Sequence, residues 1–310
     1  MKVDCSLIVL TYDRPNLLKH CLDSIMNLEK GNISFEVIIV DDGSKFDNFS
    51  IVTEYKQSLN IRFYKKNHQG VAAARNFGIK MARGMLVAFI ADDYRLPKNF
   101  LVDVVKFFEQ HTEAFVITHN ILPCGPSLFK YVQRLYFQLA LWQALESCDT
   151  KANVLKSYRL PPSRAAVFRK EIFQQIGYFN EYLLVGEDGE FGMRMASDGI
   201  LVYFFPNKYI EHWEQKNLRG YLDQRVRYGA SFFKALMAQN IKSEHHKLSF
   251  FRIFILFFSK KYFIWLKLAW RIDRGVQYLL LSPFIVLFLL FFYWGFYTEF
   301  KQNSISNRDL

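Results

Sequence analysis

Two adjacent carboxylates end an apolar run in this chain. Residues 85–94 read Met-Leu-Val-Ala-Phe-Ile-Ala-Asp-Asp-Tyr, so Asp92 and Asp93 directly follow a strand-like stretch. A buried strand of a parallel sheet is apolar on both faces, and ligands of open α/β sheets lie beyond the carboxyl ends of the strands. Carboxylates at that place commonly hold a hard cation or a polar ligand. The pair therefore predicts a binding site rather than a requirement of the fold.

A second pair of carboxylates, Asp41 and Asp42, follows the apolar run of residues 35–40. A carboxylate at the tip of a strand can accept hydrogen bonds from a base or a ribose. The same residues can instead form an Asx turn into the next helix, with Gly43 supplying an unusual backbone dihedral. Both interpretations of Asp41 stay open at the level of the sequence.

The segments that must position these side chains alternate between two periodicities from residue 1 to about residue 120. Short apolar runs, typical of buried strands, occupy residues 7–10, 35–40, 61–64, 86–90 and 115–118. Between them, apolar residues are spaced as on one face of a helix. These residues are Leu17, Leu18, Cys21, Leu22 and Ile25, then Ala74, Phe77 and Met81, then Leu101, Val104, Val105 and Phe108. The alternation predicts an α/β fold with a mainly parallel sheet and helical crossovers.

Beyond residue 120 the pattern is less regular. An aromatic-rich stretch within 121–160 predicts either a helix that packs over the sheet or a lid over a substrate. A further strand is expected at 201–205, and residues 216–247 have the pattern of a basic, polar-faced helix.

The C-terminal part has a different composition. Residues 276–298 form 23 consecutive positions without a charge, and a bilayer core needs about 20 apolar residues. We predict a transmembrane helix at 276–298, a polar tail at 299–310, and amphipathic juxtamembrane helices at 246–275 that lie on anionic lipid. The main domain would then cover residues 1–245. A buried C-terminal helical hairpin is the alternative.

Five short motifs follow one another in a fixed order. They read Ser-Leu-Ile-Val-Leu-Thr-Tyr-Asp-Arg (6–14), Val-Asp-Asp-Gly-Ser (40–44), Asn-His-Gln-Gly-Val-Ala-Ala-Ala-Arg-Asn-Phe-Gly (67–78), Phe-Ile-Ala-Asp-Asp (89–93) and Gly-Glu-Asp (186–188). This order resembles family 2 glycosyltransferases of the GT-A fold, over about residues 4–230. The resemblance implies a GT-A, Rossmann-like, mainly parallel sheet flanked by helices, and an inverting transfer of sugar from a nucleotide donor by a single displacement.

The resemblance also implies a divalent cation, Mn²⁺ or Mg²⁺. Sugar transfer breaks a bond to a diphosphate, whose growing negative charge must be neutralised, and such cations need only one or two protein carboxylates. Asp93 occupies the last position of the family's Asp-x-Asp motif and is the expected metal ligand. Ala91 occupies the first position and departs from that motif, so Asp92 is expected to supply the missing contact. His212 is expected as a further ligand or as a structural residue.

A general base must take the proton of the acceptor hydroxyl as it attacks, and the family match gives this role to Asp188. An alternative for Asp188 is a helix N-cap, because an acidic residue is favourable at the start of a helix. Arg225 and Arg227 lie in a degenerate form of the family's Gln-x-x-Arg-Trp motif. They are expected to contact the diphosphate or, alternatively, to be surface charges near lipid.

The nucleotide is expected beside the first strand. By resemblance, Thr11, Tyr12 and Arg14 lie near the nucleobase pocket, Asp41 recognises the base, expected to be uracil, and Asp92 contacts the nucleotide. Arg75 either lies near the same pocket or forms a salt bridge that braces the loop. These roles rest on the family and not on spacing.

Composition excludes several other classes of protein. The net charge of +11 is concentrated in residues 216–274, where 13 lysines and arginines face three acidic residues. Because this basic segment coincides with membrane-like sequence, nucleic-acid binding is not expected. A dehydrogenase is disfavoured because no Gly-x-Gly-x-x-Gly follows the first strand. The four cysteines lack the spacing of a zinc site or a disulfide framework.

The sequence therefore predicts a membrane-attached glycosyltransferase that acts on a glycan or lipid-linked acceptor in surface polysaccharide or glycolipid synthesis. No signal-peptide pattern is visible at residues 1–12, and lysines and arginines precede the predicted span, so we expect the catalytic domain on the cytoplasmic side of the cell membrane. A catalytically inactive nucleotide-sugar-binding scaffold is the alternative, suggested by Ala91.

Overall fold

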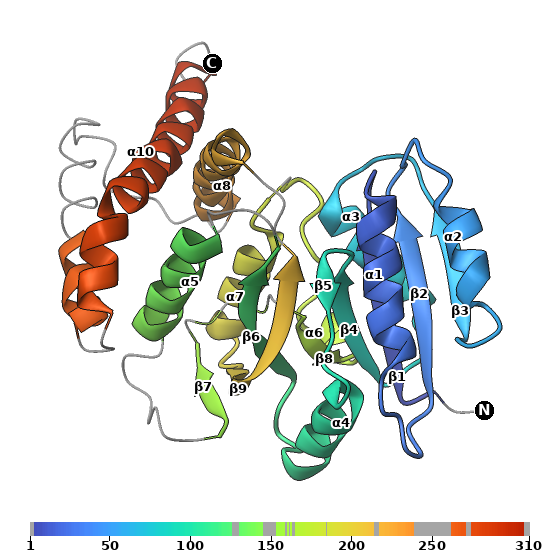
Figure 1. Ribbon diagram of the computed structural model, residues 1–310. Coiled ribbons are helices and arrows are strands. Elements are labelled where there is room, and N and C mark those ends of the chain that lie inside the picture. The colour runs from blue at the N-terminus through green and yellow to red at the C-terminus, as the bar shows by residue number, and fades with distance from the viewer. Residues whose placement is uncertain are drawn as a thin grey trace. The chain divides into compact units, whose positions relative to one another are not determined.

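The apolar runs of the N-terminal part form strands of a single sheet in the computed structural model (Figure 1). The structure describes residues 3–125, 130–144, 153–158, 160, 162, 165–183, 185–213, 217–238, 262–270 and 274–306. Its chain separates into two compact units, one of Met1–Gly125 and Ser147–Glu214 and the other of Pro126–Glu146 and Gln215–Leu310. Each unit is described by itself.

The first unit is an α/β domain in which strands and helices alternate. Its strands are β1 (Cys5–Thr11), β2 (Phe35–Asp41), β3 (Ile61–Lys65), β4 (Leu86–Ala91), β5 (Tyr94–Arg95), β6 (Val116–Cys124), β7 (Leu155–Ser157), β8 (Val167–Arg169) and β9 (Val202–Trp213). Its helices are α1 (Pro15–Met26), α2 (Asn48–Tyr55), α3 (Val71–Met81), α4 (Phe100–Gln110), α6 (Ile172–Gln175) and α7 (Glu187–Ser197). The predicted fold class is confirmed: the sheet is mixed, mostly parallel at its N-terminal side, and flanked by helices.

The order of the strands reverses direction at β1. The sheet runs β3-β2-β1-β4-β8-β6-β9-β5, with β7 paired to β9. The pairs β1–β2, β2–β3 and β1–β4 are parallel, so the chain moves from β1 to one side and later returns to the other side at β4. Such a reversal is the point at which open α/β sheets bind ligands, at the carboxyl ends of the strands. The residues after β1, β2 and β4 are therefore those best placed for a site.

Several short elements of this unit were not predicted. Helix α2 buries three of its eight residues, Asn48, Val52 and Tyr55, which is too few for a clear helical period. Strands β5, β7 and β8 have two or three residues each, below the length at which alternation can be recognised. The strand expected at 201–205 continues to Trp213, because a register shift beside Phe205 accommodates Pro206 within β9.

The second unit contains α5 (Lys130–Ala144), α8 (Leu218–Ala238), the helical residues 262–270 and α10 (Gly275–Ser306). The aromatic-rich stretch contains a helix, α5, whose side chains Val132, Leu135 and Leu139 join the core of this unit. Its predicted position over the sheet or over a substrate stays a prediction. The predicted helix at 216–247 is present as far as Ala238. Residues 239–261 and 271–273, which include much of the predicted interfacial segment, lie outside the described residues.

Helix α10 contains the predicted span and meets α8 at two glycines. A Cβ atom at Gly229 of α8 would overlap the carbonyl oxygen of Phe292, and one at Gly295 would overlap that of Val226. Glycine at both positions lets the two backbones touch. Residues Gly275–Gln302 are long and apolar enough to cross a bilayer, and 22% of their most apolar window is buried within the protein. The predicted domain boundaries remain a prediction.

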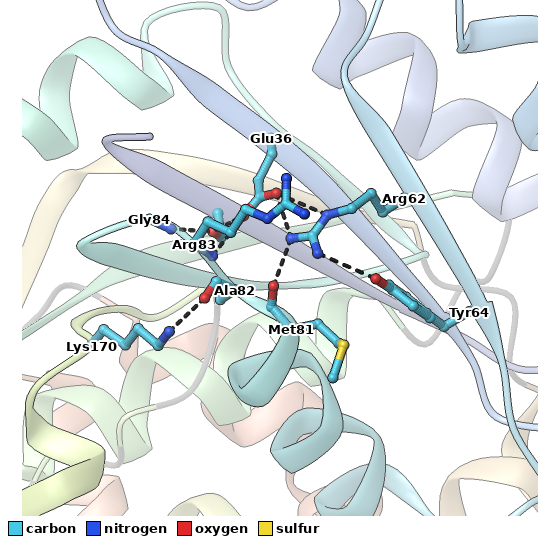
Figure 2. Close-up of polar contacts among 9 residues, drawn as sticks. Glu36, Arg62, Tyr64, Met81, Ala82, Arg83, Gly84 and Lys170 are labelled. Carbon is cyan, nitrogen blue, oxygen red and sulfur yellow. Dashed lines mark hydrogen bonds and ion pairs between the residues drawn. The ribbon is translucent and has the colours of Figure 1, made fainter. Parts of the chain in front are cut away.

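The amino ends of β1, β2 and β4 meet at a buried glutamate, Glu36 (Figure 2). Its Oε1 accepts hydrogen bonds from Ser6 Oγ at 2.7 Å and from the backbone N–H of Arg83 at 2.8 Å. Arg62 donates to Oε2 through Nη2 and Nε at 2.5 and 3.1 Å. Burial alone would raise the pKa of Glu36, but the hydrogen bonds from Ser6, Arg83 and Arg62 and the charge of Arg62 lower it below 4.5. This cluster links the amino ends of the strands, whereas the expected site lies at their carboxyl ends.

Glu36→Gln is expected to lower the free energy of unfolding at pH 7 by about 3–5 kcal/mol, because it leaves the Arg62 guanidinium without its buried partner. The pKa of Glu36 is lowered in the folded state, so its contribution is present above about pH 5 and is lost as the pH falls through the folded pKa. The difference between wild type and variant should therefore narrow below pH 4.5. Urea unfolding of both proteins between pH 3 and 7 measures this difference in the free energy of unfolding.

Glu54→Gln provides the matched control. Glu54 pairs with Lys19 at 3.3 Å, and both side chains are more than half exposed, so a loss of about 1 kcal/mol or less is expected. Equal losses for Glu36→Gln and Glu54→Gln would contradict the role given to the buried cluster.

Candidate active site

Asp92 and Asp93 share one cation, the guanidinium of Arg14. Arg14 Nη2 lies 2.6 Å from Asp92 Oδ1, and Arg14 Nη1 lies 2.7 Å from Asp93 Oδ2. Thr11, the last residue of β1, donates its hydroxyl to Asp92 Oδ2 at 2.8 Å. The two carboxylates are 1% and 9% exposed as residues. Four of the predicted site residues, Thr11, Arg14, Asp92 and Asp93, are therefore linked by direct contacts at the reversal between β1 and β4.

The Asp92 carboxylate is held at an electrostatic cost. Burial, and to a lesser extent the neighbouring charge of Asp93, raise its pKa to about 7, although Arg14 opposes the shift. The hydrogen bond from Thr11 favours the ionised form. A carboxylate with a strongly raised pKa beside a second one marks a place that favours added positive charge.

His212 reaches the same carboxylates through the pairing of β5 with β9. Tyr94, the residue after Asp93, lies opposite His212 in this antiparallel ladder. The backbone N–H of Trp213 donates to the Asp93 carbonyl oxygen at 2.7 Å, and His212 Nε2 lies 3.5 Å from Asp93 Oδ2. The structure thus brings the two predicted metal ligands together, although they are far apart in the sequence.

These residues suit a divalent cation whose other ligands come from elsewhere. Within the described residues no group of three or more His, Cys, Asp or Glu side chains could hold a metal ion. Asp93 and His212 offer one oxygen and one nitrogen donor, and Mn²⁺ and Mg²⁺ commonly take one or two protein carboxylates together with phosphate oxygens and water. The donor set fits a cation that arrives with a diphosphate better than one bound by protein alone.

The Asp41 carboxylate forms the turn that the sequence left open as an alternative. It is fully buried and accepts hydrogen bonds from the Ser44 N–H at 2.7 Å and from Asn48 Nδ2 at 2.9 Å. Gly43 has a φ of +87°, and a Cβ atom there would lie 2.8 Å from His68 N, so only glycine fits. The predicted contact of Asp41 with a base stays a prediction.

Asp42 makes a second set of contacts that sequence reasoning missed. Its carboxylate accepts hydrogen bonds from the N–H groups of Gln69 and Gly70, at 3.0 and 2.8 Å, and lies 2.8 Å from His68 Nδ1. The Tyr12 ring stacks on the His68 ring with 4.2 Å between centroids. Tyr12 and His68 thus form an aromatic surface beside β1. The Asp-Asp pair followed by Asn-His-Gln-Gly was the available signal.

Arg75 forms a salt bridge with Glu187. Its Nη1 lies 2.6 Å from Glu187 Oε1, with side-chain exposures of 16% and 6%. Glu187 is in the first turn of α7, next to Asp188. The salt bridge that the sequence offered as an alternative for Arg75 is therefore present, and its proposed nucleotide contact stays a prediction.

Asp188 lies within the first turn of α7, and Gly186 occupies the N-cap position with a φ of +84°. Asp188 is half-buried, and its Oδ1 accepts a hydrogen bond from the N–H of Gly189 at 2.8 Å. The N-cap role considered for Asp188 thus belongs to Gly186. A carboxylate in the first turn is still favoured by the partial positive charge of the helix N-terminus.

The comparisons with known proteins decide the family. The sequence model described as Glycosyl transferase family 2 matches residues 6–177, which is more than half of the chain. The chain belongs to this family. The match contains β1, β2 and β4 with the residues that follow them, and it confirms the resemblance found in the motifs.

Relatives of this glycosyltransferase agree with the assignment. An uncharacterized glycosyltransferase of Rickettsia felis is 31% identical over 219 residues, covering 66% of this chain and 35% of that protein. Chondroitin synthase of Pasteurella multocida is 24% identical over 280 residues, covering 79% and 28%. The chain therefore spans about a third of the length of the curated relatives that it matches.

Solved structures confirm the fold of the glycosyltransferase. Residues 1–349 of Staphylococcus aureus TarS in complex with UDP-GlcNAc match with a TM-score of 0.55 at 19% identity, covering 97% of this chain and 92% of that one. The mannosyltransferase PcManGT of Pyrobaculum calidifontis, in complex with GDP-Man and Mn²⁺, matches with a TM-score of 0.66 at 16% identity, covering 97% and 88%.

The two arginines of the degenerate motif lie in the second unit of the glycosyltransferase. Arg225 is 8% exposed, and its guanidinium lies 4.9 Å from the Tyr136 ring centroid and 4.8 Å from that of Tyr228. It is therefore a buried side chain among aromatic rings rather than a surface charge. Arg227 is exposed. Their predicted contact with a diphosphate stays a prediction.

Proposed function

We propose that the chain is an inverting glycosyltransferase that moves a sugar from a UDP-sugar to a glycan or lipid-linked acceptor in surface polysaccharide or glycolipid synthesis. The observation that carries the proposal is the buried pair Asp92 and Asp93. Both carboxylates contact the guanidinium of Arg14 at the reversal between β1 and β4. A UDP donor is supported by TarS structures with UDP and UDP-GlcNAc. A polysaccharide product is supported by the relatives named chondroitin synthase and hyaluronan synthase.

Asp93 and His212 would hold Mn²⁺ or Mg²⁺, and Asp92 would assist them. The chemistry that such a cation would supply there is neutralisation of the charge on the departing diphosphate. Arg14 already contacts both carboxylates, and its planar guanidinium can also donate to phosphate oxygens. We infer that, when the donor binds, Arg14 exchanges its contacts with the carboxylates for contacts with the donor's phosphate oxygens. Tyr12 and His68 would supply the aromatic surface on which the nucleobase stacks.

Asp188 would accept the proton of the acceptor hydroxyl while that oxygen attacks the anomeric carbon. The bond from that carbon to the diphosphate breaks in the same step, so the configuration inverts and no covalent sugar intermediate forms. The carboxylate lies in the first turn of α7 and is half-buried, so an acceptor hydroxyl could approach it.

Helix α10 would attach the chain to a membrane, with the catalytic unit on the cytoplasmic side. Large apolar side chains on this helix are exposed, and they are Val276, Leu279, Leu280, Leu290 and Trp294. Most of the apolar window of α10 is also not buried within the protein, which favours lipid contact over a buried hairpin. The lysines and arginines before residue 275 support the cytoplasmic side.

Asp188→Asn is expected to lower kcat by about 10²- to 10⁴-fold, because an amide cannot accept the hydroxyl proton. Affinity for UDP, measured by calorimetry with Mn²⁺, should stay within about twofold of wild type. Transfer is assayed with a panel of UDP-sugars on glycan and lipid-linked acceptors, with Asp198→Asn, an exposed residue at the end of α7, as the control. Wild type and Asp188→Asn that are equally inactive, yet bind UDP, would support the scaffold suggested by Ala91.

Arg14→Gln is expected to strengthen Mn²⁺ binding without nucleotide by about tenfold or more, because it removes a positive charge 2.7 Å from Asp93 Oδ2. Asp93→Asn should weaken the same binding by a similar factor. Both are measured by electron paramagnetic resonance of free Mn²⁺ during titration. A stronger site in Asp93→Asn than in wild type would exclude Asp93 as a ligand.

Leu280→Arg combined with Leu290→Arg is expected to reduce binding to vesicles of phosphatidylcholine and phosphatidylglycerol by at least about tenfold, since arginine is costly within a bilayer. Flotation of the full chain measures the bound fraction. Tyr182→Arg, at a position 94% exposed in the first unit, is the control and should float like wild type. Unchanged flotation of the double variant would argue against α10 as the attachment.

A further inference from the structure

The Ala-Arg-Asn sequence of α3 contacts a segment of the chain that begins at Phe179, 103 residues after Asn76. Asn76 Nδ2 donates to the Phe179 carbonyl oxygen at 2.9 Å and to Glu181 Oε1 at 2.7 Å. The Phe179 N–H donates back to Asn76 Oδ1 at 3.0 Å. Asn76 is 3% exposed, and its two bonds to the Phe179 backbone are buried, so those two form out of contact with water. One residue of α3 thus fixes the start of the segment that leads to α7.

The preceding residue, Arg75, fixes the other end of that segment. Its guanidinium contacts Glu187 Oε1 at 2.6 Å, across 112 positions of sequence. Glu187 is 4% exposed, so its carboxylate has left water and depends on this partner. Arg75 and Asn76 therefore hold the segment from Phe179 to Glu187 at both of its ends.

The guanidinium is itself held between two aromatic rings. It lies 5.5 Å from the Phe89 centroid and 5.2 Å from the Phe179 centroid, distances at which a cation is attracted to the ring face. Phe89 belongs to β4 and precedes Asp92 by three residues. Arg75 thus connects the strand that ends in the carboxylate pair with the helix that begins at Glu187.

Fixing Glu187 also fixes the direction of its neighbour. Successive residues of an α-helix are 100° apart around the axis, so an inward Glu187 sets the face on which Asp188 lies. The N-cap residue, Gly186, has a left-handed φ of +84° and makes no side-chain capping bond. Arg75 therefore holds the first turn of α7 through Glu187, while Phe191 and Met195 bury the rest of the same face.

We propose that Arg75 is a positioning residue that acts through Glu187 on Asp188, and that it does not contact the nucleotide. The inference rests on the proposed role of Asp188 as the base. Arg75 sets the place from which the Asp188 carboxylate accepts the hydroxyl proton. A displacement of about 1 Å in a reacting group can cost about 10²-fold in rate.

The test compares Arg75→Met, Arg75→Lys and the double variant Arg75→Met/Glu187→Gln in the full chain. The double variant removes both charges, so neither is left buried alone if Arg75→Met fails to fold. We expect kcat to fall about 10²-fold in Arg75→Met and in the double variant, with donor KM and the Kd of UDP within about threefold of wild type. Arg75→Lys keeps a positive charge and should recover part of kcat.

Arg83→Met is the matched control, because Arg83 is exposed and follows the same helix. Its kcat should equal that of wild type. A Kd for UDP raised tenfold or more in Arg75→Met, with kcat retained, would overturn the proposal in favour of a nucleotide contact. A folded double variant with wild-type kcat would overturn it in favour of a purely structural ion pair.

A second readout separates this inference from the proposed function. The Glu190 N–H closes the first turn of α7 on the Gly186 carbonyl oxygen at 3.0 Å. Hydrogen exchange at Glu190 should be at least tenfold faster in the double variant than in wild type, while exchange within α4 stays the same. Should wild type transfer no sugar, the proposed function fails, but faster exchange at Glu190 still supports the positioning contact and unchanged exchange still refutes it.

Discussion

The structure of the site depends on keeping two adjacent carboxylates out of water at the end of β4. Asp92 and Asp93 repel each other, and burial raises the pKa of Asp92 to about 7. Arg14 offsets this cost from the start of α1, and Thr11 offsets it from the end of β1. Both contacts need β1 and β4 side by side, which the strand order provides. The strand order that reverses at β1 therefore also provides the contacts that stabilise the two buried carboxylates.

The two ends of the sheet treat buried carboxylates in opposite ways. At the amino end, donors from Ser6, Arg83 and Arg62 outweigh the burial of Glu36 and lower its pKa. At the carboxyl end, burial outweighs Arg14, and the pKa of Asp92 is raised. A carboxylate that the protein satisfies fully stabilises the fold, whereas one that stays short of positive charge can recruit a ligand. The pKa shifts of Glu36 and Asp92 therefore have opposite signs at the two ends of the strands.

Local pattern was enough to predict the long strands and the residues at their tips, because a buried strand and its polar end are adjacent in sequence. It could not predict contacts between distant segments, such as Arg75 with Glu187 or Asp42 with His68. Those depend on where α3 and α7 pack, which no window of the sequence contains. Arg225 is similar: a charged residue in a basic helix reads as exposed, yet aromatic rings surround its guanidinium.

Alanine at position 91 is compatible with catalytic activity. It is the last residue of β4, paired with Leu10 of β1, and Asp92 follows it with its own contacts to Thr11 and Arg14. A third carboxylate at position 91 would add like charge where burial already raises the pKa of Asp92 to about 7. Since a divalent cation needs only one or two protein carboxylates, alanine at this position lowers the repulsion and leaves Asp93 and His212, the donors proposed above, in place.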